Sequence, residues 1–304
     1  MFADNANLLH SSPDTQNAQI VRRLGKIFHR VLIVDEHDKL LFEGAKPPLD
    51  YETLRDVIDL ALWAGQLLLQ NGAESQQVEE TVHRLGTGLG CDWMDILVSP
   101  NAIVITAISN GEFRTKVRRV VNIGVDMRIL VEVSTLVSRV IDGELDRHQL
   151  RAELERVSTL KPCYNRWVVA VMVGIACASF SRLFGGDAVI FAVTFLAATV
   201  AMLLRQELHK QRLNPFLTVI ITAFVGSCIA SIVPLFNLSD QPQLSLISTV
   251  LLLIPGVPLI NAVQDLLKGS MLTGIARGVT GAAISASIAL GLLLAMSLLR
   301  VSGL

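Results

Sequence analysis

Residues 253–262 combine two prolines, a glycine and an asparagine in an otherwise apolar stretch. Pro255 and Pro258 each lack a backbone donor, and Gly256 permits unusual backbone dihedrals, so a helix should break here and restart near Pro258. The free N–H groups at the start of the new helix could hold an anionic group. The segment therefore predicts an anion site whose break is shaped by Pro255, Gly256 and Pro258.

Polar residues follow the break at helical spacing. Asn261 lies about one turn into the restarted helix, and Asp265 lies one turn further on the same face. We expect Asn261 to bind the anion and Asp265 to act in gating or proton handling, with Lys268 or Arg277 as the ion-pair partner of Asp265. The alternative is a structural proline kink with Asp265 in solvent.

A second cluster of polar residues lies near residue 74. Ser75 is expected to cap a helix whose early acids, Glu79 and Glu80, favour the helix dipole. The alternative is a cytoplasmic vestibule or gate, formed by Glu74 and Ser75 together with Asn101.

Signals for catalysis or for a cofactor are missing from the sequence. There is no phosphate loop, HExxH or GxSxG motif, and the six histidines are scattered. The four cysteines have no paired spacing, which argues against a zinc site or a disulfide framework. A net charge of −1 argues against nucleic-acid binding. We predict no enzyme, no catalytic residue, no metal and no cofactor.

Charge is unevenly distributed along the chain of 304 residues. Residues 1–166 hold 42 of the 53 charged side chains, while 51% of the whole chain is hydrophobic. A single soluble domain does not divide its charge in this way. The expected fold class is an α-helical polytopic membrane protein with an N-terminal α+β cytoplasmic domain.

Five uncharged stretches are long enough to cross the roughly 30 Å of bilayer hydrocarbon. The expected transmembrane helices lie at about 165–184, 187–205, 214–236, 243–263 and 275–299. The last one carries small residues at helical spacing, which favour close helix packing: Gly274, Gly278, Gly281, Ser285 and Ala289.

Lysine and arginine predict the orientation of these helices. Eight lie near the helix ends on one side and two, Arg182 and Arg300, on the other. The richer side should be cytoplasmic. No apolar signal-peptide core is visible in the first 30 residues. We expect a multi-pass protein of the bacterial inner membrane with a periplasmic C-terminus.

The part before the membrane helices divides in two. Residues 1–50 are an N-terminal extension with a short hairpin at 31–42, and residues 51–160 form the α+β domain. Expected helices begin near residues 51, 75, 126 and 146, and three strands lie between residues 93 and 121. Residues 161–304 form the membrane domain.

Three motifs together resemble the threonine/serine exporter family. They are residues 71–75 with 78–79, residues 99–103, and residues 255–262 with Asp265. The resemblance covers about residues 55–300. It implies export of succinate or a related small carboxylic acid, together with a smaller multi-span membrane subunit and in a possible higher oligomer. Threonine/serine export is the alternative, followed by a membrane-anchored cytoplasmic enzyme or sensor.

Overall fold

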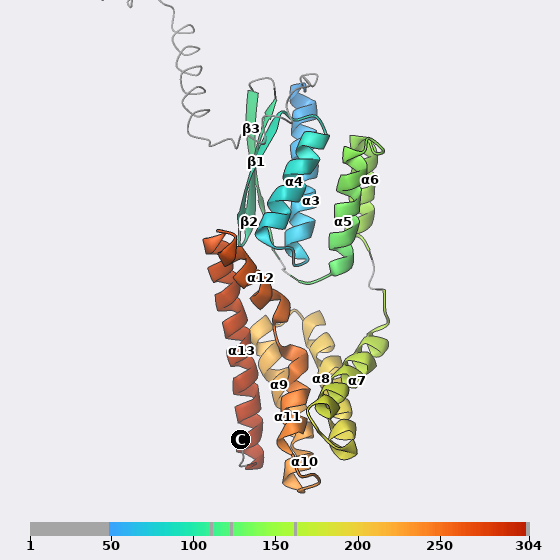
Figure 1. The fold of residues 1–304 in the computed structure, drawn as a ribbon, viewed down its shortest axis with the longest axis vertical. Helices are drawn as coiled ribbons and strands as arrows, with labels where there is room; N and C mark the ends of the chain where they lie inside the picture. The colour runs from blue at the N-terminus through green and yellow to red at the C-terminus, as the bar shows by residue number, and fades with distance from the viewer. Residues whose placement is uncertain (1–48, 110–111, 122–123, 161–162, 302–304) are drawn as a thin grey trace, which may run out of the picture. The chain divides into compact units, whose positions relative to one another are not determined.

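The computed structural model describes residues 49–109, 112–121, 124–160 and 163–301. The expected hairpin at residues 31–42 and nearly all of the expected extension lie outside the described residues. The described chain is mostly helical with one small sheet near its N-terminal end (Figure 1).

The elements before residue 160 follow the order that the sequence predicts. They are α3 (Tyr51–Gln70), α4 (Ser75–Gly88), β1 (Trp93–Ser99), β2 (Ala102–Ser109), β3 (Glu112–Arg119), α5 (Met127–Ile141) and α6 (Arg147–Ser158). The strands form an antiparallel sheet in the order β1-β2-β3. Figure 1 shows the helices gathered on one side of it.

Alternating burial along β2 explains how this sheet packs. Ile103, Ile105 and Ala107 are fully buried, and the residues between them are only partly covered. A strand directs successive side chains to opposite faces, so one face of β2 belongs to the core. That core includes Ile58 of α3 and Val82 of α4.

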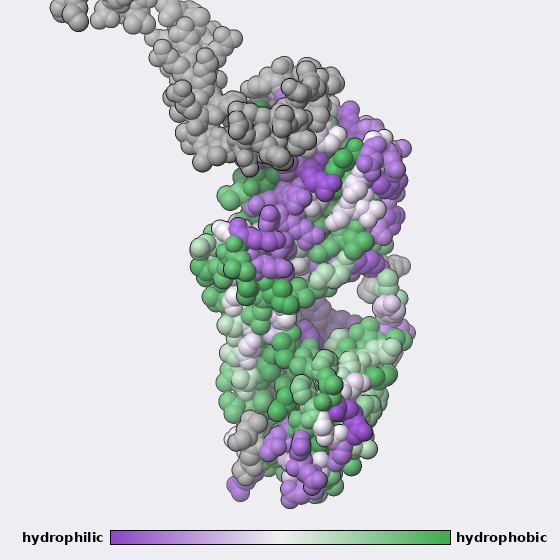
Figure 2. Space-filling view, viewed as in Figure 1, coloured by the Kyte–Doolittle hydropathy of each residue, from purple (hydrophilic) through white to green (hydrophobic). Residues whose placement is uncertain are grey.

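Apolar helices make up most of the chain after residue 165. They are α7 (Arg166–Leu183), α8 (Ala188–Lys210), α9 (Pro215–Ala230), α10 (Ile232–Leu235), α11 (Gln243–Val250), η1 (Leu251–Leu253), α12 (Gly256–Leu267) and α13 (Met271–Leu299). Among the described residues, four spans are long and apolar enough to cross a membrane, with α9 and α10 counted together. The pair α11–η1 and α12, bent by 62°, brings the total to five if it is one span. Hydrophobic residues dominate the visible surface of this region (Figure 2).

The restart of the broken helix differs from the expectation. α12 begins at Gly256, with Pro255 as its N-cap, so Pro258 is the third helical residue. The first N–H groups of a helix have no intrahelical acceptor, and a proline in the first turn therefore removes no helical hydrogen bond. The break itself is confirmed, but it falls before Gly256.

The small residues of α13 pack against other helices of the same chain. A Cβ placed on Gly274 or Gly281 would meet Leu266 or Leu259 of α12, and one on Gly291 would meet Ile220 of α9. Glycine allows this close approach of helix backbones. The predicted close packing is confirmed, and for these glycines the neighbours are α12 and α9.

Candidate functional site

The break between η1 and α12 is a polar point inside an apolar region. Helix α11 tightens into the 3-10 turn η1, and α12 leaves at an angle of 62°. The Leu252 carbonyl accepts a hydrogen bond from Arg205 Nη1 at 3.2 Å. A backbone carbonyl next to the break thus has a hydrogen-bond partner.

The first contact of α12 with the N-terminal elements is made by Asn261. Its Nδ2 donates a hydrogen bond of 2.7 Å to the carbonyl oxygen of Gly72. Gly72 lies in the turn between α3 and α4 with φ of +97°, a conformation that favours glycine. The turn therefore presents its carbonyl groups to α12.

Asp265 is the most buried charged residue of this contact, with 1% of its surface exposed. Its Oδ1 accepts from the backbone N–H of Ser75 at 2.9 Å, and its Oδ2 accepts from Arg277 Nη1 at 2.8 Å. Ser75 is the first residue of α4, where N–H groups lack intrahelical acceptors and the helix dipole favours an anion. Asp265 thus supplies a hydrogen-bond acceptor for the N-terminal Ser75 N–H of α4, although it lies in a distant part of the chain.

Two further contacts complete the arrangement. Arg277 Nη2 donates to the carbonyl oxygen of Ala73 at 2.8 Å, and Lys268 forms an ion pair with Glu74. We call this set of contacts the polar clamp: Asn261, Asp265, Lys268 and Arg277 on one side, and residues 72–75 on the other. Thr273 Oγ1 also donates to the Val98 carbonyl at 3.4 Å, which joins α13 to β1.

Of the two partners expected for Asp265, Arg277 forms the pair and Lys268 binds Glu74 instead. Asp265 is not in solvent, because α4 covers it. Ser75 is not the N-cap of α4: Glu74 occupies that position without a side-chain cap, and Asp265 supplies the acceptor.

Asn101 stands apart from the polar clamp. It lies exposed in the turn between β1 and β2, where its carbonyl accepts from the Val120 N–H. Its grouping with Glu74 and Ser75 therefore gains no support from a shared contact among the described residues.

Glu79 lies one turn after Ser75 on α4 and is partly buried. Burial raises the pKa of its carboxyl, and the nearby charge of Asp265 raises it further, although a hydrogen bond with the Val98 backbone acts in the opposite direction. Glu79 therefore takes up a proton more readily than an exposed glutamate, at a position next to the clamp.

The sequence assigned Arg205 only to the positively charged side of the membrane helices, and it gave no role to three hydroxyl groups in the helices after residue 165. Thr194, Ser227 and Ser248 are buried, and their hydroxyl oxygens have no hydrogen-bond partner among the described residues. Most buried helical hydroxyls bond the carbonyl one turn earlier, as Thr222 does here. Arg205 could have been singled out in the sequence because it is an arginine at the end of an apolar run. Single serine or threonine residues in apolar runs carry no such signal.

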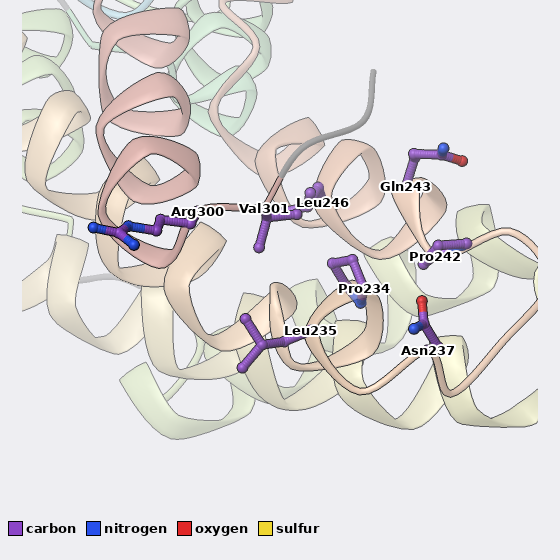
Figure 3. A pocket seen from close by; sticks show the side chains of 8 residues that line it. All are labelled: Pro234, Leu235, Asn237, Pro242, Gln243, Leu246, Arg300 and Val301. Atoms are coloured by element: carbon purple, nitrogen blue, oxygen red, sulfur yellow. The ribbon is translucent and has the colours of Figure 1, made fainter.

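A pocket of about 290 Å³ lies away from the clamp, between α10, α11 and the end of α13 (Figure 3). It is lined by Pro234, Leu235, Asn237, Pro242, Gln243, Leu246, Arg300 and Val301. The guanidinium of Arg300 extends away from the other lining side chains (Figure 3). Within the described ranges, no group of three or more metal-ligating side chains is present.

Comparison with known proteins places this architecture in a family. Residues 59–299 match the family described as "Putative threonine/serine exporter". The chain belongs to this family of membrane exporters. Membership in a transporter family implies a protein that is not an enzyme.

Two relatives match this chain over nearly their whole length. A protein of Klebsiella aerogenes, "Probable succinate transporter subunit YjjP", is 37% identical over 257 residues, which are 84% of this chain and 98% of the relative. The protein of the same name from Escherichia coli K12 is 36% identical over 253 residues, 83% of this chain and 98% of the relative.

A more distant relative is longer. The "Probable threonine/serine exporter" of Mycobacterium tuberculosis is 21% identical over 245 residues, which are 80% of this chain but 46% of that protein. No solved structure matches the chain.

Proposed function

We propose that the chain is one subunit of an inner-membrane exporter of small dicarboxylic acids, with succinate as the first candidate. Two near-full-length relatives named as succinate transporter subunits support the substrate. The polar clamp at a broken helix is the structural observation that carries the transport role. Broken membrane helices with polar contacts at their ends are a recurring feature of transporter substrate pathways.

A smaller multi-span membrane subunit completes the exporter in this proposal, in a possible higher oligomer. The Mycobacterium tuberculosis and Corynebacterium glutamicum exporters match this chain over only 46% and 48% of their lengths. A second protein would supply what corresponds to the remainder. The contacts of Gly274 and Gly281 with α12 mean that these residues do not form the partner surface.

The proposed topology has five membrane spans in residues 161–304, with α11–η1 and α12 as one bent span. The α+β domain of residues 51–160 is then cytoplasmic and the C-terminus periplasmic. The eight-to-two distribution of lysine and arginine supports this orientation.

Cysteine labelling tests the topology. In a background without the four native cysteines, a cysteine at Asp240 is expected to react with an impermeant maleimide added outside the inner membrane. A cysteine at Lys210 is expected to react only after the membrane is opened, because it lies on the positively charged side. The reverse pattern would contradict the topology.

The polar clamp is proposed to act as the cytoplasmic gate. Pro255 and Gly256 shape the break, with Pro258 in the first turn of α12, and Asp265 and Arg277 hold the gate shut against the turn at residues 72–75. The amide of Asn261, expected to bind substrate, becomes available only when that turn moves away, because Gly72 now occupies it.

The membrane potential can drive such an export. A succinate dianion leaving a cell with a negative interior gains about 2.3 kcal/mol per charge per 100 mV. A zwitterionic amino acid gains nothing from the potential. Threonine/serine export remains the second candidate because of the more distant relatives. A membrane anchor for an enzyme or sensor has no need for the buried contacts of the clamp.

Reconstitution tests the proposed function. Liposomes containing this chain and the proposed smaller membrane subunit are expected to release loaded succinate. Liposomes with the chain alone are expected to release none, since the exporter is incomplete. Equal release of succinate by both preparations would contradict the need for a partner. Release of threonine or serine without succinate would favour the second candidate.

A further inference from the structure

We propose that the polar clamp is a receptor for two carboxylates, occupied in this structure by the chain's own Asp265 and Glu74. A dicarboxylate substrate then opens the gate by taking their places. This inference rests on the proposed function and adds to it the class of ligand and the event that releases the gate.

The first seat is the one that holds Asp265. The Asp265 carboxylate accepts hydrogen bonds from the Ser75 N–H at the start of α4 and from Arg277 Nη1. Asp265 has 1% of its surface exposed. A helix N-terminus and a guanidinium are both favourable binding groups for carboxylates. Neither donor is specific for an aspartate side chain, so a free carboxylate fits the same seat.

Buried polar atoms of the clamp that lack a hydrogen-bond partner among the described residues also indicate a ligand. Ser75 has 0% of its surface exposed, yet its hydroxyl has no hydrogen-bond partner among the described residues. The same holds for Oε2 of Glu74. Buried polar atoms are normally satisfied, and exceptions need an explanation. A ligand carboxylate in the first seat could accept a hydrogen bond from the Ser75 hydroxyl.

The second seat is the ion pair of Lys268 with Glu74. Glu74 directly precedes Ser75, and Lys268, the C-cap of α12, lies three residues after Asp265, so the two seats adjoin. Two acids are therefore held by two cations. A dicarboxylate can replace both acids, whereas an acid with a single carboxylate can replace only one. The ammonium group of a zwitterion would be repelled by Lys268 and Arg277.

Exchange of carboxylates lowers the cost of opening. If the gate simply separated, Arg277 would lose its carboxylate while still partly shielded from water, with 13% of its side chain exposed. Leaving a buried charge without its partner is strongly unfavourable. If a substrate carboxylate enters as Asp265 leaves, Arg277 and the Ser75 N–H stay paired throughout. The substrate itself then favours the open gate.

This inference is tested by removing the Asp265 carboxylate and adding succinate to replace it. Purified full-length Asp265→Ala in detergent is expected to melt below the wild-type chain, and added succinate is expected to raise its melting temperature. Succinamate, which has one carboxylate and one amide, should give a smaller rise. The matched control is Asp240→Ala, which removes an exposed aspartate from a loop and should respond to succinate only as weakly as wild type.

Direct binding provides the second measurement. Asp265→Asn removes the charge of the internal competitor, so it is expected to bind radiolabelled succinate about tenfold more tightly than wild type. A tenfold difference in affinity is expected if Asp265 leaves its binding position free about a tenth of the time in the wild-type chain. This variant also serves if Asp265→Ala does not fold, because asparagine can still accept from the Ser75 N–H.

The outcomes separate this inference from the proposed function. An Asp265→Ala chain that responds to succinate no more than Asp240→Ala, or an Asp265→Asn chain that binds succinate no more tightly than wild type, would overturn the inference. Equal rescue by succinate and succinamate would overturn the two-carboxylate part. If wild type with its partner still exports succinate in those cases, the proposed function stands without the receptor. Failure of wild-type export contradicts the function itself.

Discussion

Replacing Arg277 by glutamine is expected to abolish export and to destabilise the chain by about 3–5 kcal/mol. The substitution leaves Asp265 buried without its cation, and breaking a buried pair from one side has a cost of this size. It also removes the donor to the Ala73 carbonyl. Thermal melting of the purified chain and succinate release from reconstituted liposomes measure the two effects.

Two variants serve as controls for Arg277→Gln. Arg182→Gln removes an exposed arginine whose hydrogen bond goes to the Gly186 carbonyl, so its effect should stay within about 0.5 kcal/mol. Arg277→Lys keeps the charge but cannot reach both Asp265 and Ala73 with a planar fork, and an intermediate effect is expected. If Arg277→Gln melts and exports like Arg182→Gln, the clamp neither stabilises the chain nor gates it.

A single added methyl group on Gly274 is expected to have the second largest effect. Its Cβ would lie 3.0 Å from both the Ala262 carbonyl oxygen and the Leu266 backbone nitrogen of α12. Backbone atoms cannot rotate out of the way, so α12 must shift and the overpacking should cost about 1–3 kcal/mol. Because α12 carries Asp265, Gly274→Ala should also reduce export.

Gly278 offers the matched substitution one turn further along α13. A Cβ there would meet only the Ala262 Cβ, at 3.8 Å, which is ordinary van der Waals contact. Gly278→Ala is therefore expected to melt and export like wild type. Melting temperatures and succinate release that are equal for the two alanine variants would show that the close approach of α12 and α13 at Gly274 is not required.

Local patterns allowed much of the fold to be predicted. The three strands predicted between residues 93 and 121 match β1, β2 and β3, because turn residues separate short strand-forming runs. Apolar runs identified the long helices, and Pro255 identified the break. The start of α12 was misplaced because prolines are tolerated anywhere in the first helical turn, so Pro258 did not mark its first residue.

The candidate site was predictable in its members but not in its contacts. Helical spacing correctly placed Asn261 and Asp265 on one face of α12. The Gly72 carbonyl and the Ser75 N–H that they meet lie almost two hundred positions earlier, and no local pattern relates such distant segments. The choice between Lys268 and Arg277 as the partner of Asp265 likewise depends on how α13 packs beside α12.

The dependence of α4 on Asp265 has a consequence for the order of synthesis. The acceptor for the Ser75 N–H lies 190 residues later in the chain. At a synthesis rate of about 5–20 residues per second, the ribosome needs about 10 to 40 s to reach Asp265 after completing Ser75. During that time the start of α4 lacks its final acceptor, which arrives only when α12 has been made. The N-terminal elements therefore reach their finished state only after the broken helix pair has been synthesised.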